Sequence, residues 1–182
     1  MTDTITDLPG DLTAKQRIAR MIRVDHAGEY GAKRIYAGQL AVLGRRPVGE
    51  EIRHMQAQEQ VHLDGFSNLI INRRVRPTAL LPFWHIAGWA LGAATAALGE
   101  RAAMACTVAV EEAIDEHYAA QSAALGDDEA NLRDTIEAYR ADELEHRDTG
   151  LAHGAEQTPG YGLLSKIIKT GCKIAIAASE RI

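Results

Sequence analysis

The feature that most constrains this chain is a repeated Glu-x-x-His spacing, which places two ionisable side chains on the same face of a helix. The spacing occurs at Glu51 and His54, at Glu59 and His62, and at Glu143 and His146. A Glu or His on an apolar helix face needs a partner, because burying an unpaired charge costs several kcal/mol. The fold therefore depends on which of the three pairs face a core.

Helical periodicity separates the three pairs. The apolar stripe that contains Glu59 and His62 is formed by Ile52, Met55, Phe66 and Ile70. The stripe that contains Glu143 and His146 is formed by Leu132, Ile136, Tyr139 and Gly150. His54 points away from the first stripe, so its pair belongs to the solvated surface. We predict that the other two pairs lie on core faces.

The same pattern recurs in the two halves of the chain. Ile52, Met55, Glu59 and His62 recur 84 positions later as Ile136, Tyr139, Glu143 and His146, and Glu29 and Tyr36 recur 82 positions later as Glu111 and Tyr118. Each half thus supplies one helix with an inward Glu and a following helix with an inward Glu-x-x-His pair. This is the ligand set of a di-iron or di-manganese carboxylate bundle.

A dinuclear metal site explains why these ionisable residues occupy core faces. Two divalent ions balance four carboxylates, two imidazoles complete the coordination, and no Lys or Arg lies on these faces. The predicted ligands are Glu29, Glu59, His62, Glu111, Glu143 and His146. Such a set favours iron or manganese, and open positions on Fe(II) permit O₂ binding. In one alternative these acidic residues face water. In another, Glu112 takes the place of Glu111, but the repeat favours Glu111.

Proline and glycine divide the chain into six long segments without alternating β-branched runs, so we predict an all-α fold. The expected helices cover about residues 13–43, 48–74, 82–99, 101–125, 127–150 and 162–182, with Asp127 or Asp128 as the N-cap of the fifth. Four form a bundle with a two-fold internal repeat, and two are additional apolar or amphipathic helices. We expect an N-terminal extension, residues 1–12, and a single domain, residues 13–182.

Charge and cysteine content exclude several classes of protein. A net charge of −5 provides no general attraction to nucleic acid. Cys106 and Cys172 are the only cysteines, which excludes a disulfide framework and favours a reducing compartment. The first residues carry Asp3, Asp7 and Asp11 and lack the pattern of a signal or transit peptide, so we expect a protein kept in a bacterial cytoplasm.

Five segments carry a resemblance to a known family. They are RVDHAGEYGAKRIYAGQ (residues 23–39), EQVHL (59–63), ACTVAVEEAIDEHY (105–118), DELEH (142–146) and GCKIAIAASERI (171–182). Together they resemble the demethoxyubiquinone hydroxylase family of ubiquinone biosynthesis, over nearly the whole chain from Thr13. The resemblance implies a ferritin-like fold whose two Fe ions activate O₂ to hydroxylate C6 of the 5-demethoxyubiquinone ring. The family's ligands match the six residues above, with Glu59 and Glu143 as bridging candidates.

The resemblance also implies a reductant and partners. We expect NADH as an electron donor that is not tightly bound, and the chain has no Gly-x-Gly-x-x-Gly motif for a nucleotide. Expected partners are the polyprenyl quinone, O₂, a membrane surface and other ubiquinone-biosynthesis proteins, with a homo-oligomer left open. Tyr118 and its neighbour His117 are candidates for a hydrogen-bond or electron-transfer network near the metals, with a plain core tyrosine as the alternative. Further candidates for contacts with ligands are Asp25, His26 and Asp142.

The least polar segments suggest where a lipid-soluble quinone would enter. Residues 79–99 carry no formal charge, yet their Pro, His and three Gly make a membrane span unfavourable, and Trp84 with Trp89 is typical of an interface. In the last helix, apolar residues that include Ile168 gather on one side. Lysines gather on the other side, at Lys166, Lys169 and Lys173. An ordinary surface helix packed on the core is the alternative.

These features lead to an expected location and to competing functions. We expect peripheral binding at the cytoplasmic face of the bacterial inner membrane. The competing function is a ferritin- or rubrerythrin-like iron oxidase or peroxidase, although rubrerythrin-type electron transfer needs cysteine pairs and a ferritin cage needs a polar outer surface. A third interpretation is a purely structural membrane-associated bundle, which a measurement of metal content would dismiss.

Overall fold

The computed structural model describes residues 10–182, and within them the chain forms helices and no strand. The α-helices are α1 (Ala14–Leu43), α2 (Gly49–Asn72), α3 (Leu81–Ala97), α4 (Glu100–Ala124), α5 (Ala130–Ala152) and α6 (Tyr161–Ser179). Two short 3₁₀ helices, η1 (Asp127–Glu129) and η2 (Ala155–Gln157), precede α5 and α6. The all-α prediction is confirmed. Of the expected N-terminal extension, residues 1–9 lie outside the described part of the chain.

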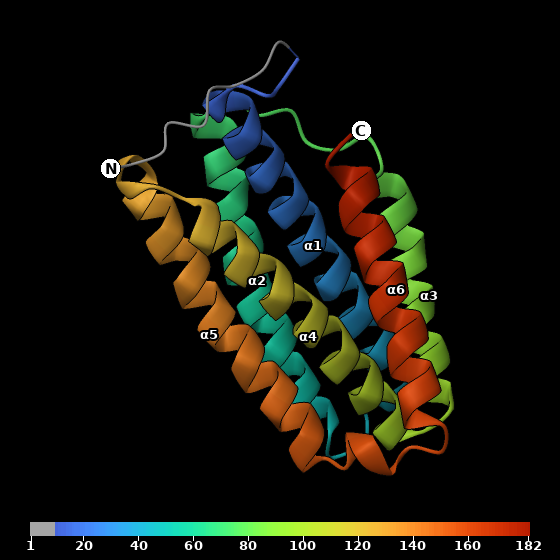
Figure 1. The fold of residues 1–182 in the computed structure, drawn as a ribbon. Coiled ribbons are helices and arrows are strands. Elements are labelled where there is room, and N and C mark those ends of the chain that lie inside the picture. Colours follow the sequence, from blue (N-terminus) through green and yellow to red (C-terminus); the bar gives the residue numbers. More distant parts are fainter. Residues whose placement is uncertain (1–9) are drawn as a thin grey trace.

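The helices are arranged in three layers of two (Figure 1). α2 lies beside α5, α1 lies beside α4, and α3 lies beside α6. The first two layers form a ferritin-like four-helix bundle, and the third layer covers the outer side of α1 and α4. The two halves of the chain follow the same route, because α3 packs on α1 as α6 packs on α4. The predicted bundle with two added helices is therefore confirmed, and the repeat extends to the third helix of each half.

The helix ends follow the sequence signals at most positions. α1 begins with a capping box, in which the Thr13 side chain accepts a hydrogen bond from the Gln16 amide and the Gln16 side chain accepts one from the Thr13 amide. The expected N-cap of the fifth helix was wrong. Asp127 and Asp128 form the 3₁₀ helix η1, and α5 begins only at Ala130 without a side-chain cap. The Asp127 carboxylate instead accepts a hydrogen bond from Arg133.

The third-layer helix of the first half lies very close to its neighbour. A Cβ atom added to Gly92 of α3 would overlap the carbonyl oxygen of Ile35 in α1, and one added to Gly38 of α1 would overlap the carbonyl oxygen of Trp89. Glycine is thus required on both sides of this contact, because any side chain would push the two backbones apart.

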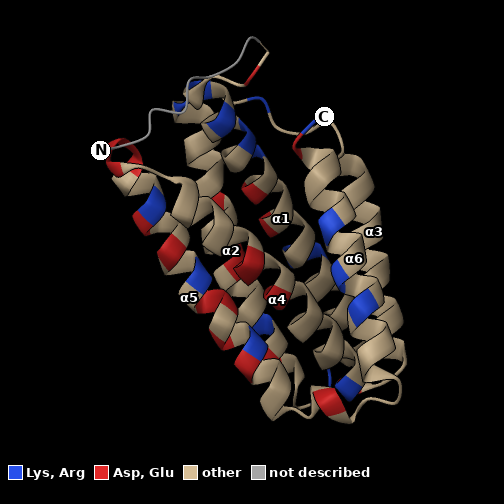
Figure 2. Ribbon diagram, viewed as in Figure 1, with Lys and Arg blue, Asp and Glu red and all other residues tan. Residues whose placement is uncertain are grey.

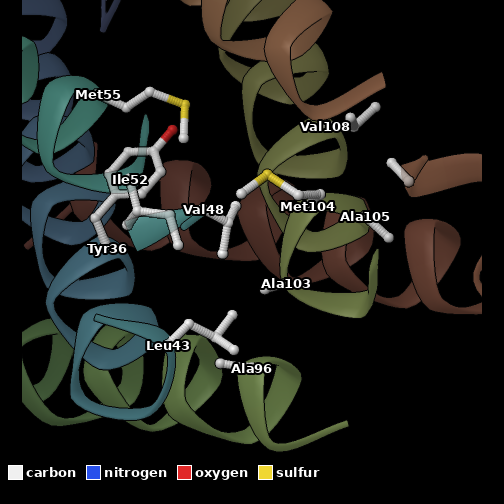
Figure 3. Packing of buried hydrophobic residues seen from close by; sticks show 11 residues of the cluster. Tyr36, Leu43, Val48, Ile52, Met55, Ala96, Ala103, Met104, Ala105 and Val108 are labelled. Atoms are coloured by element: carbon white, nitrogen blue, oxygen red, sulfur yellow. The ribbon is translucent and has the colours of Figure 1, made fainter. Parts of the chain in front are cut away.

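Two apolar clusters occupy the two ends of the bundle. The first contains Tyr36 and Leu43 of α1, Met55 of α2 and Met104 of α4, and Figure 3 shows these side chains. The second contains Ile22, Phe66, Tyr118, Leu132 and Ile136. The predicted metal-ligand positions fall between these clusters along each helix, so water is excluded from both ends of the intervening region.

Charged residues are distributed unevenly over the layers (Figure 2). Buried acidic residues lie on all four bundle helices, α1, α2, α4 and α5, and lysines follow one another along α6. α3 contains no Lys, Arg, Asp or Glu over its whole length. The outer layer therefore combines an uncharged helix with an amphipathic one.

Candidate metal centre

The six ionisable residues that the repeat singled out come together in the middle of the bundle. They form two overlapping groups, each with ligand atoms within 4.8 Å of one another: Glu29, Glu59, His62 and Glu143 in the first, and Glu59, Glu111, Glu143 and His146 in the second. None of the six is more than 1% exposed. Glu59 and Glu143 belong to both groups, which is the placement that two bridging carboxylates would need.

The imidazoles turn the same nitrogen atom toward the carboxylates. Nδ1 of His62 lies 3.1 Å from Oε1 of Glu143 and 3.4 Å from Oε2 of Glu29. Nδ1 of His146 lies 3.2 Å from Oε2 of Glu143 and 3.4 Å from Oε1 of Glu59. Both Nδ1 atoms thus converge with the carboxylates, while both Nε2 atoms point away from them.

The other ring nitrogen of each histidine, Nε2, also has a hydrogen-bond partner. Nε2 of His62 lies 2.9 Å from Oδ2 of Asp142, and Nε2 of His146 lies 3.0 Å from Oε1 of Gln58. Asp142 was among the expected contacts, whereas sequence reasoning missed Gln58. The repeat could have found it, because Gln58 occupies the position 84 residues before Asp142. Such contacts fix which nitrogen of each ring is available to a metal.

Without a cation the cluster is electrostatically strained. Burial raises the pKa of Glu59 and of Glu111 well above the usual value, and the charge of Glu143 adds to the effect. Burial also opposes ionisation of Glu143, but hydrogen bonds from His146 and His62 lower its pKa to about 2. For His62 burial lowers the pKa, yet the contacts with Glu143 and Glu29 outweigh this effect and raise it to about 11. Positive charge close to these carboxylates therefore favours their ionised forms.

Several carboxylate oxygens in this region have no hydrogen-bond partner among the described residues. They are Oε2 of Glu29, both side-chain oxygens of Glu59 and Oε2 of Glu111, and all are buried. Unpaired buried carboxylate oxygens are unfavourable unless a cation binds them. The number, type and orientation of these donors fit two divalent metal ions.

Two tyrosines link the halves of the cluster. The hydroxyl of Tyr36 donates a 2.6 Å hydrogen bond to Oε1 of Glu111, and the hydroxyl of Tyr118 donates a short one to Oε1 of Glu29. Tyr36 and Glu29 belong to one half of the chain, and Tyr118 and Glu111 belong to the other. Each tyrosine therefore orients a carboxylate of the opposite half.

The sequence as a whole matches one protein-family model. Residues 16–179, which include all six clustered residues, match the family described as ubiquinone biosynthesis protein COQ7. The chain belongs to the COQ7 family. The resemblance inferred from the five sequence segments is thereby confirmed.

Curated members of the COQ7 family cover most of this chain. A Rhodospirillum rubrum protein named 3-demethoxyubiquinol 3-hydroxylase is 59% identical over 176 residues, which are 96% of this chain and 83% of the relative. A human protein named NADPH-dependent 3-demethoxyubiquinone 3-hydroxylase, mitochondrial, is 52% identical over 176 residues, 94% of this chain and 81% of the relative. A Saccharomyces cerevisiae protein named 5-demethoxyubiquinone hydroxylase, mitochondrial, is 42% identical over 183 residues, 90% of this chain and 77% of the relative.

In this COQ7-family chain, His117 does not join the clustered residues. Its Nε2 atom lies 3.2 Å from Oδ1 of Asp25 and 2.8 Å from Nε2 of Gln121. The same carboxylate oxygen of Asp25 accepts a 2.8 Å hydrogen bond from Gln121. Burial raises the pKa of Asp25 to about 6, although His117 acts in the opposite direction. The candidate His26, which burial shifts to a lower pKa, has no hydrogen-bond partner for Nδ1 among the described residues.

The exposed apolar surface of α6 is smaller than the sequence indicated. Ile168 was expected at the membrane or substrate entrance, but it is only 5% exposed and packs with Cys106, Ala109 and Val110. This assignment was wrong because the broad apolar arc of α6 has an inner part that faces α4. The exposed large apolar residues of α6 are Leu163, Ile167 and Ile174.

The lysines of α6 do not all face open solvent. Lys169 forms an ion pair with Glu112 of α4, and Nζ of Lys173 lies 3.0 Å from Oε2 of Glu116. Lys166 is exposed. The sequence showed the lysines on one side of their helix but not the acidic neighbours on α4 that two of them contact.

The two tryptophans of α3 have different environments. Trp84 is half-buried, and its indole nitrogen donates a 3.1 Å hydrogen bond to the Ser179 hydroxyl of α6. Trp89 is exposed, as are Phe83 and Ile86 on the same helix. Among the described residues, no helix combines the length and the apolarity that crossing a membrane requires.

Proposed function

We propose that this chain is a di-iron monooxygenase of ubiquinone biosynthesis that uses O₂ to hydroxylate the ring of a polyprenyl demethoxyubiquinone. The overlapping groups of four buried ligand atoms carry the proposal, because they offer two adjacent cation positions that share Glu59 and Glu143. Membership of the COQ7 family and the names of the relatives, which specify hydroxylation of demethoxyubiquinol or demethoxyubiquinone, support the substrate class.

In this proposal the six clustered residues share three tasks, two residues to each. Glu29 and His62 would hold one iron, Glu111 and His146 would hold the other, and Glu59 and Glu143 would contribute a carboxylate to both positions. Bound iron supplies the reaction with O₂ that hydroxylation of a carbon atom requires. The tyrosines orient two of the carboxylates through the hydrogen bonds from Tyr36 to Glu111 and from Tyr118 to Glu29. The apolar clusters at the two ends of the bundle exclude water from the site.

The electrons come from a reduced nicotinamide that binds weakly. The sequence resemblance suggested NADH, whereas the names of the mammalian relatives specify NADPH. Turnover measured separately with the two nucleotides decides which one this chain uses. A preference for either leaves the assignment of the metal site unchanged.

We place the quinone entrance at the third layer. Phe83, Ile86 and Trp89 of α3 and Leu163, Ile167 and Ile174 of α6 expose a total of six large apolar side chains. A polyprenyl tail resides in lipid, so we propose that this layer binds peripherally to the cytoplasmic face of the inner membrane. Since Lys169 and Lys173 are paired with glutamates of α4, we expect only a modest dependence on anionic lipid.

The entrance is tested by vesicle flotation with variants of two neighbouring residues. Ile167→Glu places a charge on an exposed apolar position, so we expect weaker flotation and slower turnover of long-tailed than of short-tailed quinone. Lys166→Gln is the control for the anionic-lipid contribution and should change flotation by less. Unchanged flotation and turnover in Ile167→Glu would contradict the proposed membrane surface.

The reaction is tested by aerobic turnover with a demethoxyquinone, a reduced nicotinamide and labelled O₂. We expect one labelled oxygen atom in the hydroxylated product and no product with Glu111→Ala, whose fold is checked by circular dichroism. Glu112→Ala is the matched control, because Glu112 follows Glu111 on α4 but pairs with Lys169 at the surface. Label found only in water would contradict the monooxygenase and support an iron oxidase or peroxidase instead.

A further inference from the structure

We propose that the two metal positions are inequivalent and that the position at His62 binds the first ion, because a carboxylate supports His62 where an amide supports His146. This inference rests on the proposed dinuclear site. It concerns Asp142 and Gln58, which contact no carboxylate of the cluster but hold the two imidazoles, and which therefore act as positioning residues.

The two supporting residues are equivalents in the internal repeat. Gln58 directly precedes Glu59, and Asp142 directly precedes Glu143. Each reaches across to the imidazole of the opposite half, at 2.9 Å for Asp142 to His62 and 3.0 Å for Gln58 to His146. The geometry is therefore matched, and the chemical difference lies in the acceptor.

The acceptor determines how strongly each imidazole donates to a metal. When Nδ1 of an imidazole binds a cation, Nε2 carries the proton and donates a hydrogen bond. A carboxylate acceptor forms a charge-assisted bond that is roughly twice as strong as the neutral bond to an amide oxygen. The stronger bond increases electron density on the ring and stabilises the cation bound to it. Asp142 thus favours the position at His62.

Ring packing reinforces the same difference. Tyr139 stacks on His62, with ring centroids 4.1 Å apart and an interplanar angle of 24°. Gly65 leaves the room for this ring, since a Cβ atom there would overlap the Tyr139 hydroxyl. His146 has no such stack on it among the described aromatic rings: Tyr36 meets it edge-on, with centroids 6.1 Å apart. The repeat equivalent of Tyr139 is Met55. His62 is therefore held in its binding orientation more firmly than His146.

The test is anaerobic titration of the metal-free protein with Co(II), followed by visible absorption, and repeated with Fe(II). For the unmodified chain we expect two resolved steps of one ion each. Asp142→Asn keeps the shape of the side chain and removes the charge, so it should weaken the first step about 10- to 100-fold and leave the second nearly unchanged. Gln58→Glu adds a charge next to Nε2 of His146 and should increase the affinity of the second step. The affinities of the two steps should then become more similar.

Two further variants assign the steps to positions. His62→Ala should abolish the tight step and His146→Ala the weak one. Asp148→Asn is the matched control on α5, because Asp148 pairs with Arg147 at the surface and should not alter either step. Asp142→Glu should recover the tight step in part, since it restores a carboxylate.

The outcomes separate this inference from the proposed function. Two indistinguishable steps that neither Asp142→Asn nor Gln58→Glu changes would overturn the inequivalence and leave the dinuclear site intact. An equal weakening of both steps in Asp142→Asn would also overturn it. Failure of the unmodified chain to bind either metal would overturn the dinuclear site itself. The side chain of Asp142 is 39% exposed, so its replacement does not disrupt the core.

Discussion

The two halves of this molecule share a ligand set but surround it with different chemistry. Near Glu29, the Gln121 amide donates to Asp25, and His117 contacts both. At the equivalent place in the other half, the Gln39 amide donates to Thr107 and to the carbonyl oxygen of Ala103. The repeat places Asp25 opposite Thr107 and His117 opposite Ile35. One end of the site is thus ionisable and the other is neutral.

The regions just outside the two ends of the site differ in the same way as the ends themselves. His117 and Gln121 line an open pocket of about 320 Å³ that Arg20 and Glu180 also line. Ile35, by contrast, belongs to the apolar cluster that joins Ile168 of α6 with partly buried Leu91 of α3. The ionisable end therefore adjoins a surface pocket with charged side chains in its lining, and the neutral end adjoins the apolar third layer. The repeat thus keeps the same ligand types in both halves, while their surroundings differ: ionisable and charged side chains lie near one end and apolar side chains near the other.

Iron binding should depend equally on Glu59 and Glu143, one from each half of the chain. Glu59→Gln and Glu143→Gln should each lose nearly all bound iron, because each residue belongs to both groups of ligand atoms. Metal analysis after anaerobic reconstitution measures the loss, and Glu51→Gln, a surface Glu-x-x-His glutamate, should retain two ions. Retention of iron in only one of the two bridging variants would show that the halves differ at the centre as well.

Substitutions in the two third-layer helices should destabilise the fold for opposite reasons: loss of a side-chain contact in α6 and steric overlap in α3. α6 packs on α4 through the side chain of Ile168, so Ile168→Ala should reduce the free energy of unfolding by about 2–5 kcal/mol. α3 packs on α1 through backbone contact at Gly92, so Gly92→Ala should cost about 1–3 kcal/mol despite the better helix propensity of Ala. Denaturant unfolding measures both. A neutral Gly92→Ala would mean that α3 can move away from α1 freely.

The ionisable end should respond to pH and the neutral end should not. The pKa of Asp25 is about 6 in the folded chain, above its usual 3.8, so its stabilising contribution is complete at low pH and is lost as the pH rises through 6. Asp25→Asn cannot ionise. It should exceed the unmodified chain in stability by as much as about 3 kcal/mol above pH 7 and match it at about pH 3, below both pKa values.

The repeat equivalent supplies the control for this pH dependence. Thr107→Val should change the free energy of unfolding by the same amount at both pH values, measured on metal-free protein. A pH-independent effect of Asp25→Asn would remove the electrostatic distinction between the two ends.

The smallest effects belong to the ion pairs between α4 and α6. Lys173 and Glu116 are both exposed, and such surface pairs contribute less than about 1 kcal/mol. Lys173→Gln should therefore change the unfolding midpoint little, and high salt should remove what difference remains. A large loss of stability would mean that these ion pairs, rather than Ile168, hold α6 on the bundle.

Sequence periodicity was sufficient for the helices and for the six clustered residues, because helix phase and the internal repeat both constrain which side chains face inward. It failed at Ile168, since an apolar arc shows which side of a helix is hydrophobic but not how much of that side a neighbour covers. It also failed at Asp127, whose carboxylate contacts Arg133, and it did not indicate that Lys169 has a partner on another helix. Each failure concerns a contact between segments that the local pattern does not contain.

Several hydrogen bonds of the site join one half of the chain to the other, as they would in a symmetric dimer. Tyr36 and Tyr118 each orient a glutamate of the opposite half, and Gln58 and Asp142 each support the opposite histidine. Two identical three-helix chains related by a two-fold axis could form every one of these contacts. In such a homodimer, however, any change would appear twice, so an aspartate behind one histidine would require an aspartate behind the other. A single chain that contains both halves allows Gln58 and Asp142 to differ, so the two histidines of a nearly symmetric scaffold can have different partners.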